Sequence, residues 1–194
     1  KSLARTRLHM NFSDGGKPIP LLKFTLMDNF EVSISGKILF RAKDLTPIQR
    51  ELLALLITAK GQRIPQEKIV VELWPESGPV NARKSLDTLL SRVRQQLTPL
   101  LPTTIKEYFF LQKGILCLDN YEIDALQFQE IARLGISHSK NNEWLQAHSA
   151  FQTALAIWKG SMPDDTFQSE QALDFNDNLT HLLVKIGSIW ANSL

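Results

Sequence analysis

The side chains best suited to chemistry lie between residues 81 and 95, and that chemistry is hydrogen bonding to an anionic or polar partner. At about 100° per residue in a helix, the apolar side chains of this segment fall within about 60° of Leu86. No acid lies on the opposite face, because Asp87 is on its flank. Such a face suits the phosphates and base edges of duplex DNA, and the alternative is an ordinary solvated helix face. The polar face consists of Asn81, Lys84, Thr88, Ser91, Arg92 and Gln95.

Catalysis and metal binding find little support in the sequence. Asp164-Asp165 adjoins the helix-breaking run of residues 160–163, which is typical of turn or cap chemistry. Cys117 alternates with apolar neighbours like a small buried hydrophobe, and a single cysteine excludes an internal disulfide and a cysteine-based zinc site. We therefore expect no enzyme, no metal site and no cofactor. No Walker-type phosphate loop occurs, and no ligand spacing relates the four histidines, His9, His138, His148 and His181.

The net charge of +2 conceals an asymmetry along the chain. Residues 1–40 carry six basic and three acidic side chains, and residues 41–106 carry eleven and six. Residues 107–194 carry five basic and eleven acidic side chains. A basic front and an acidic back favour a nucleic-acid-binding part joined to a part with another role. The acidity is explained by a solvated helical surface, and the alternative is that it keeps this half off DNA and available to protein partners.

Alternating apolar residues predict strands near the start of the chain. Leu22, Phe24 and Leu26 form one face of the first strand, with Met27 on the other face. Further strands are expected at residues 30–34 and 38–40, joined by a turn, so the segment predicts a short antiparallel meander. Residues 1–20 are typical of a flexible lead-in or linker.

Helical periodicity follows. The first predicted helix has Thr46 as its N-cap, Pro47 as its first residue and Gly61 at its end. A second helix is expected over about 66–74, stopped by Pro75, and a third over about 81–97. Residues 105–110 and 115–118 predict a hairpin with Lys113 at its tip. The first helix buries Leu52, Leu53, Leu55 and Leu56, and the second buries Ile69, Val70 and Leu73.

Only helices are suggested after residue 123, over 124–137, 142–158 and 167–190. Alanines four residues before Phe151 and Trp158 are typical of tetratricopeptide packing, and of any helical hairpin. About two repeats are too few to bury a continuous core, so we expect this array to lean on the first domain, on a second copy or on sequence outside the chain. The apolar stripe of the last helix is expected to be intramolecular core, with a dimer surface or a cut edge as alternatives.

The predicted fold class is α+β, mostly α. A winged helix-turn-helix, made of an N-terminal antiparallel sheet, three helices and a C-terminal hairpin, precedes a tetratricopeptide-like all-α domain. The expected divisions are a linker at 1–20, a winged helix at 21–120 and a helical domain at 121–194. No apolar run is long enough to cross a membrane. The chain begins at Lys1 rather than Met, so we expect it to be a piece of a longer protein.

Several motifs, in this order, resemble one family. The first set resembles the OmpR-type winged helix of SARP-type (antibiotic regulatory protein) transcriptional activators. Residues 123–128 and 154–160 resemble the bacterial transcriptional activator domain, a tetratricopeptide-like array fused behind that winged helix. The resemblance covers about residues 22–190. The first set comprises Phe30-Glu31-Val32, Leu45-Thr46-Pro47, Leu73-Trp74-Pro75, Asn81-Ala82-Arg83 and residues 90–97.

The resemblance implies a sequence-specific DNA-binding transcriptional regulator, and an activator, with helix 81–97 in the major groove and hairpin 105–118 as the wing. It implies double-stranded DNA and RNA polymerase as partners, a homodimer on direct repeats, no membrane, and a cytoplasmic, nucleoid-associated location in a bacterium. The alternative is a protein-interaction module whose winged helix docks or dimerises. The residues expected to bind DNA are Asn81, Lys84, Thr88, Ser91, Arg92, Arg94, Gln95 and Lys113.

Helix geometry ranks Arg92 above Arg94 as a base or phosphate ligand. Arg94 points to the flank, about 80° from the apolar stripe, and could equally brace the hairpin or an acid. The chain also departs from the family pattern. Pro65 replaces the usual capping Ser of the second helix, and the wing lacks the common Gly-Tyr-Arg-Leu ending. A less basic wing leaves Lys113, with Lys106, for phosphate contacts.

Overall fold

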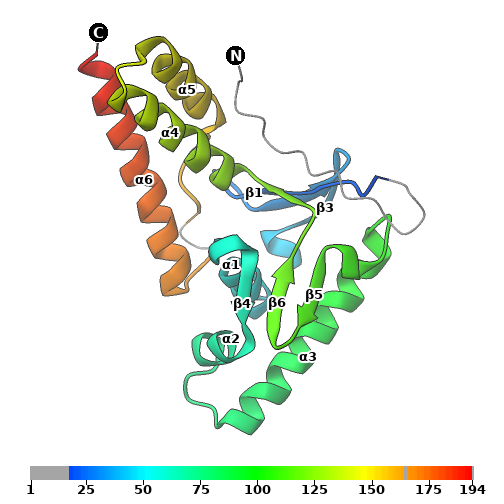
Figure 1. Ribbon diagram of the computed structural model, residues 1–194. Coiled ribbons are helices and arrows are strands. Elements are labelled where there is room, and N and C mark those ends of the chain that lie inside the picture. The colour runs from blue at the N-terminus through cyan, green and yellow to red at the C-terminus, as the bar shows by residue number, and fades with distance from the viewer. Residues whose placement is uncertain (1–17, 164–165, 194) are drawn as a thin grey trace.

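A four-stranded sheet, of order β3-β2-β1-β7, joins the two ends of the winged helix (Figure 1). The computed structural model describes residues 18–163 and 166–193. The predicted meander is confirmed: β1 (Leu22–Thr25), β2 (Glu31–Ile34) and β3 (Lys37–Arg41) pair antiparallel. A strand that the sequence did not predict, β7 (Tyr121–Ile123), pairs parallel with the other edge of β1. Met27 is buried, contrary to expectation, because β1 ends before it and the alternation stops there.

A second sheet, of order β4-β6-β5, carries the hairpin. It contains β4 (Arg63–Pro65), β5 (Phe109–Gln112) and β6 (Ile115–Leu118). The predicted hairpin begins too early, because residues 105–107 form a 3-10 turn rather than a strand. Its turn is also shorter than expected and consists of Lys113 and Gly114, both with positive φ, as in a type I′ hairpin turn.

The three helices of the winged helix are α1 (Pro47–Thr58), α2 (Gln66–Leu73) and α3 (Pro79–Leu97). All four predicted leucines of α1 are buried. Gly61 does not end α1: Ala59, with an extended backbone, is the C-cap, and Gly61 lies in a 3-10 turn at φ 64°. Of the three residues predicted to face inward in α2, Ile69 is fully buried, while Val70 and Leu73 are partly buried against the core. The third helix begins two residues earlier than predicted, at Pro79.

Three further helices form the second half: α4 (Asp124–Lys140), α5 (Trp144–Ile157) and α6 (Glu170–Ala191). The hairpin of α4 and α5 lies at one end of the molecule, and α6 runs from beside α1 toward this hairpin (Figure 1). The predicted helix 142–158 is too long at both ends, because residues 142, 143 and 158 are not helical. The predicted helix 167–190 begins too early, because residues 167–169 are not helical. In α6, Leu179 and Ile186 are buried as expected, but Leu173 is 46% exposed.

One continuous apolar core runs through both halves. The helical half leans on the winged helix, which was one of the three expected supports: the Glu51 carboxylate of α1 accepts the backbone N–H groups of Gln168 (2.6 Å) and Ser169 (2.9 Å). Of the predicted linker, residues 1–17 lie outside the described residues, as does Asp164-Asp165. Ile19 is buried in the core, so the last residues of the predicted linker are structured.

Candidate nucleic-acid interface

The orientation of α3 is determined by its buried face and by two glutamines. Leu86, Leu90 and Val93 are at most 3% exposed and pack into the core. The Gln49 Nε2 of α1 donates to the Gln96 Oε1 at 3.1 Å, and Gln96 in turn donates to the Asp44 carbonyl at 3.2 Å. These contacts turn the opposite face of α3 to the outside, at the edge of the molecule (Figure 1).

The predicted polar face of α3 is exposed along its whole length. Its flanking acid, Asp87, lies 3.8 Å from Arg83 Nε, and this pairing offsets the one carboxylate near the face. The Thr88 hydroxyl donates to the Lys84 carbonyl at 2.9 Å, so its oxygen remains available as an acceptor. The exposed side chains are Asn81, Lys84, Thr88, Ser91, Arg92 and Gln95.

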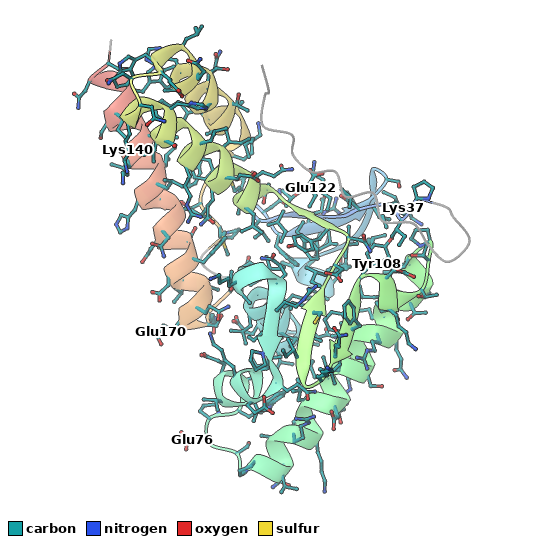
Figure 2. All side chains as sticks on the ribbon, viewed as in Figure 1. Lys37, Glu76, Tyr108, Glu122, Lys140 and Glu170 are labelled. Atoms are coloured by element: carbon teal, nitrogen blue, oxygen red, sulfur yellow. The ribbon has the colours of Figure 1, made fainter. Side chains whose placement is uncertain are left out.

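The wing lies beside α3 and is supported at its base by a buried tyrosine. The Tyr108 hydroxyl, labelled in Figure 2, donates to the Pro20 carbonyl at 2.9 Å. Tyr108 is fully buried, and desolvation raises its pKa, so the hydroxyl stays a neutral donor. At the tip, Lys113 is exposed, and Leu111 and Ile115 are each 38% exposed. The tip therefore offers one cation between apolar side chains.

Pro65 leaves the start of α2 without a side-chain cap. The wing compensates, because the Gly114 carbonyl accepts the backbone N–H of Gln66 at 2.9 Å. The hairpin turn and α2 are thus connected directly, and the second helix does not depend on a capping serine.

Among the predicted residues of α3, Arg94 lies apart from the exposed face. It is half-buried, and its guanidinium carbon is 6.0 Å from the ring centre of Phe109 on β5. This places Arg94 against the hairpin, in a cation–π contact.

Arg63 is a structural residue of the wing that sequence reasoning missed. Its guanidinium pairs with Asp119 at 2.6 Å, donates to the Leu118 carbonyl at 2.9 Å and lies over the ring of Phe110 at 5.8 Å. It stands on β4, a three-residue strand with no alternation to reveal it. The signal available in the sequence was a lone arginine before Ile64-Pro65, which is weak.

The cysteine and the described histidines do not form a common site. Cys117 is 2% exposed, and burial raises the pKa of its thiol, as expected for a small hydrophobe. His138 pairs with Glu143, and His148 lies 2.8 Å from the Ser193 hydroxyl, while His9 is outside the described residues. Within residues 18–163 and 166–193, no three His, Cys, Asp or Glu side chains are grouped to hold a metal ion. In the same ranges, no helix has the length and apolar character to cross a membrane.

Comparison with known proteins places these features in context. Residues 41–108 match the family "Transcriptional regulatory protein, C terminal". The chain is 23% identical over 146 residues to the transcriptional regulatory protein MoaR1 of Mycobacterium tuberculosis, covering 74% of this chain and 46% of MoaR1. It is 27% identical over 125 residues to the regulatory protein DnrI of Streptomyces peucetius, covering 60% of this chain and 46% of DnrI. The chain therefore spans about half the length of these relatives.

The fold also has a counterpart among solved structures. Mycobacterium tuberculosis EmbR, solved in complex with a low-affinity phosphopeptide, superposes with a TM-score of 0.70 at 22% identity. The match covers 89% of this chain and 45% of EmbR. It confirms the fold class, a winged helix followed by an all-α domain, across both halves.

Proposed function

We propose that this chain, which contains an OmpR-like winged helix and has SARP-type regulators as relatives, is a sequence-specific DNA-binding regulator of transcription. One observation carries the proposal: six polar or cationic side chains on one face of α3 are all exposed, and the nearby acid is paired with Arg83. Such a face is compatible with a phosphate-lined major groove.

In this proposal α3 enters the major groove and the β5–β6 hairpin touches the adjacent minor groove through Lys113. Residues 21–120 bind DNA, and residues 121–194 form the activator part that meets RNA polymerase in the cytoplasm, at the nucleoid. A homodimer on direct repeats fits the family. The proposed DNA ligands are Asn81, Lys84, Thr88, Ser91, Arg92, Arg94, Gln95 and Lys113.

The experiment begins with selection of bound sequences from a random duplex pool. On the selected duplex, Arg92→Ala is expected to weaken binding by about 1–3 kcal/mol, because Arg reads guanine or anchors a phosphate. The matched control is Arg133→Ala, an exposed arginine on α4. If Arg92→Ala and Lys84→Ala both titrate like the wild type, the assigned reading face is wrong.

The alternative is a protein-interaction module, favoured by exposed apolar side chains such as Val71 and Leu145, which are 66% and 82% exposed. Ionic strength separates the two functions. DNA affinity falls steeply with salt as counterions are released from the duplex. A docking module shows no duplex affinity even at low salt.

A further inference from the structure

We propose that the exposed face of α5 is a contact surface for a second copy of this chain, whose own α5 lies against it antiparallel about a two-fold axis. This surface lies at the opposite end of the molecule from α3 (Figure 1). It is separate from the DNA-binding face, so the contact goes beyond the proposed function.

No Lys, Arg, Asp or Glu side chain stands on α5. Residues Trp144–Ile157 contain none of these types, although they make up 22% of the chain. The neighbouring helices carry both signs of charge, from Asp124 to Lys140 in α4 and from Glu170 to Lys185 in α6. The outward faces of surface helices are normally polar and charged, whereas the cores of protein interfaces are depleted of charge. The composition of α5 therefore favours an interface.

One side of α5 is already occupied within the chain. Ala147, Phe151 and Ala154 are 0% exposed and pack into the core beside α4. The opposite side is open and includes Leu145, which is 82% exposed. A single exposed leucine is ordinary on a protein surface. Here the same uncharged helix also exposes 40% of Trp144, so apolar area and absence of charge occur together.

A stripe of four exposed residues runs along the open side of α5. At about 100° per residue, Ser149, Gln152 and Ala156 lie within about 40° of Leu145. All four are exposed. The stripe has a large apolar residue at one end, a small one at the other and two polar residues between them. His148, the one titratable residue of α5, is part-buried and lies to the side of this stripe.

The stripe is complementary to an inverted copy of itself. Antiparallel pairing centred midway between Ser149 and Gln152 brings Leu145 of one copy level with Ala156 of the second copy. It also brings Ser149 level with Gln152, so the amide donates to the hydroxyl. A two-fold axis repeats each of these pairings once. Parallel pairing would instead place large on large and small on small, which leaves a gap at one end.

The charges at the two ends of α5 favour the same arrangement. Glu143 comes directly before α5, where it pairs with His138, and Lys159 follows soon after the helix. Antiparallel pairing brings Glu143 of one copy within one residue of the level of Lys159 of the second copy. Opposite charges then meet at both rims, and the two helix dipoles oppose each other. Parallel pairing would bring like charges together, so a second copy fits best when inverted.

The size of the face predicts a reversible contact. A helix of 14 residues is about 21 Å long, so one helix pair buries less than the about 1,200 Å² of a standard interface. We expect a dissociation constant in the micromolar range or weaker. Such a dimer leaves both copies of α3 free at its distant ends (Figure 1). Its two-fold symmetry also differs from the head-to-tail relation of neighbours on direct repeats.

The first test is sedimentation equilibrium of the full chain without DNA, up to about 1 mM, the effective concentration that a short tether gives. Leu145→Glu should raise the dissociation constant of the dimer at least about tenfold, because each dimer then contains two carboxylates in the contact. The matched control is Val184→Glu, since Val184 is a 61% exposed residue of α6, and it should leave the constant unchanged. Thermal unfolding checks that both variants are folded.

The second test measures the register with a short bismaleimide crosslinker. The native Cys117 is 2% exposed, so the introduced thiols react in preference. A mixture of Leu145→Cys and Ala156→Cys chains should give crosslinked dimers. Leu145→Cys alone should not, because antiparallel pairing separates the two copies of residue 145 by about 16 Å along the helix. Val184→Cys supplies the rate of random collision.

Each test has an outcome that would overturn the proposal. A wild type that stays monomeric, or a Leu145→Glu dimer as tight as the wild type, would leave the uncharged face to a different protein. Faster crosslinking of Leu145→Cys to itself than to Ala156→Cys would contradict the antiparallel pairing. Neither test contains DNA, so these failures are distinct from a failure of the proposed function.

Discussion

Asp124 stands where the sheet meets the helical half, and its carboxylate ties the two together. It accepts the backbone N–H groups of Leu26 (2.9 Å), Met27 (3.2 Å) and Ala125 (2.7 Å). Burial outweighs these hydrogen bonds and raises the pKa of Asp124 above its ordinary value of 3.8. The native state therefore binds this proton more tightly than the unfolded chain does.

The raised pKa gives Asp124 a definite pH dependence. Its titration stabilises the native state fully below pH 3.8, and this contribution is lost as the pH rises through the raised pKa. In Asp124→Asn the lost hydrogen bonds change the free energy of unfolding by an amount that does not depend on pH, because the side chain no longer titrates. The unfolding free energy of the variant minus that of the wild type, from urea titrations at pH 3 to 7, should rise and then level off. A difference that falls with pH would mean that the three amides outweigh burial.

Gly135 and Gly187 form a matched pair of helical glycines in α4 and α6. A Cβ at Gly135 would lie 2.6 Å from the Phe151 ring and 3.2 Å from the Ala150 Cβ, whereas Gly187 has no neighbour within 4 Å among the described residues. We expect Gly135→Ala to lower the unfolding free energy by about 1–3 kcal/mol through overpacking. Gly187→Ala should raise it by about 0.5–1 kcal/mol through helix propensity. Equal effects of the two substitutions in urea unfolding would contradict this packing.

At the scale of elements, α6 obtains its N-terminal acceptor from another helix. Its own N-cap, Ser169, makes no side-chain cap bond, and the Glu51 carboxylate of α1 accepts the backbone N–H of Ser169 itself. Gln171 adds a second connection by donating to the Leu55 carbonyl at 2.8 Å and the Thr58 hydroxyl at 2.7 Å. The last helix is thus positioned by the winged helix.

Removal of the Glu51 carboxylate should lower the stability of the protein measurably. We expect Glu51→Ala to lower the unfolding free energy by about 1–2 kcal/mol, because the N–H groups of Gln168 and Ser169, just before α6, lose their acceptor. Glu130→Ala, an exposed carboxylate on α4, should change it by less than about 0.5 kcal/mol. Similar losses in the two variants, by chemical denaturation, would show that the Glu51 contact is not structural.

At the scale of the whole molecule, the two halves share a sheet and a core. β7 follows the expected boundary at residue 120 and pairs with β1, so the main sheet continues into the second half. Phe30 beside β2 and Phe167 before α6 meet edge to face at 5.2 Å. A continuous core predicts cooperative unfolding of both halves.

Hydrogen exchange can measure that cooperativity in the Gly135→Ala and Gly187→Ala variants. If the halves unfold together, Gly135→Ala should lower the opening free energy of the slowest amides in α1 by the same amount as in α4. Gly187→Ala should raise both together. A change confined to α4–α6 would show that the halves open independently.

The sequence by itself determined the helices and the chemistry of α3. Helical period and capping are local, so the leucines of α1, the polar face of α3 and the α4–α6 succession could be read from spacing alone. The fold class followed because these elements occur in a distinctive order. The DNA ligands on α3 remain a prediction, although their common exposure agrees with the predicted face.

Only the tertiary structure decided the strands β4 and β7, the placement of Arg94 and the docking of α6. Strands of three residues carry no period, and they form because distant partners supply their hydrogen bonds. The contact of Arg94 with Phe109 and that of Glu51 with the start of α6 join residues far apart along the chain. Such contacts depend on which surfaces meet, and spacing in the sequence does not record that.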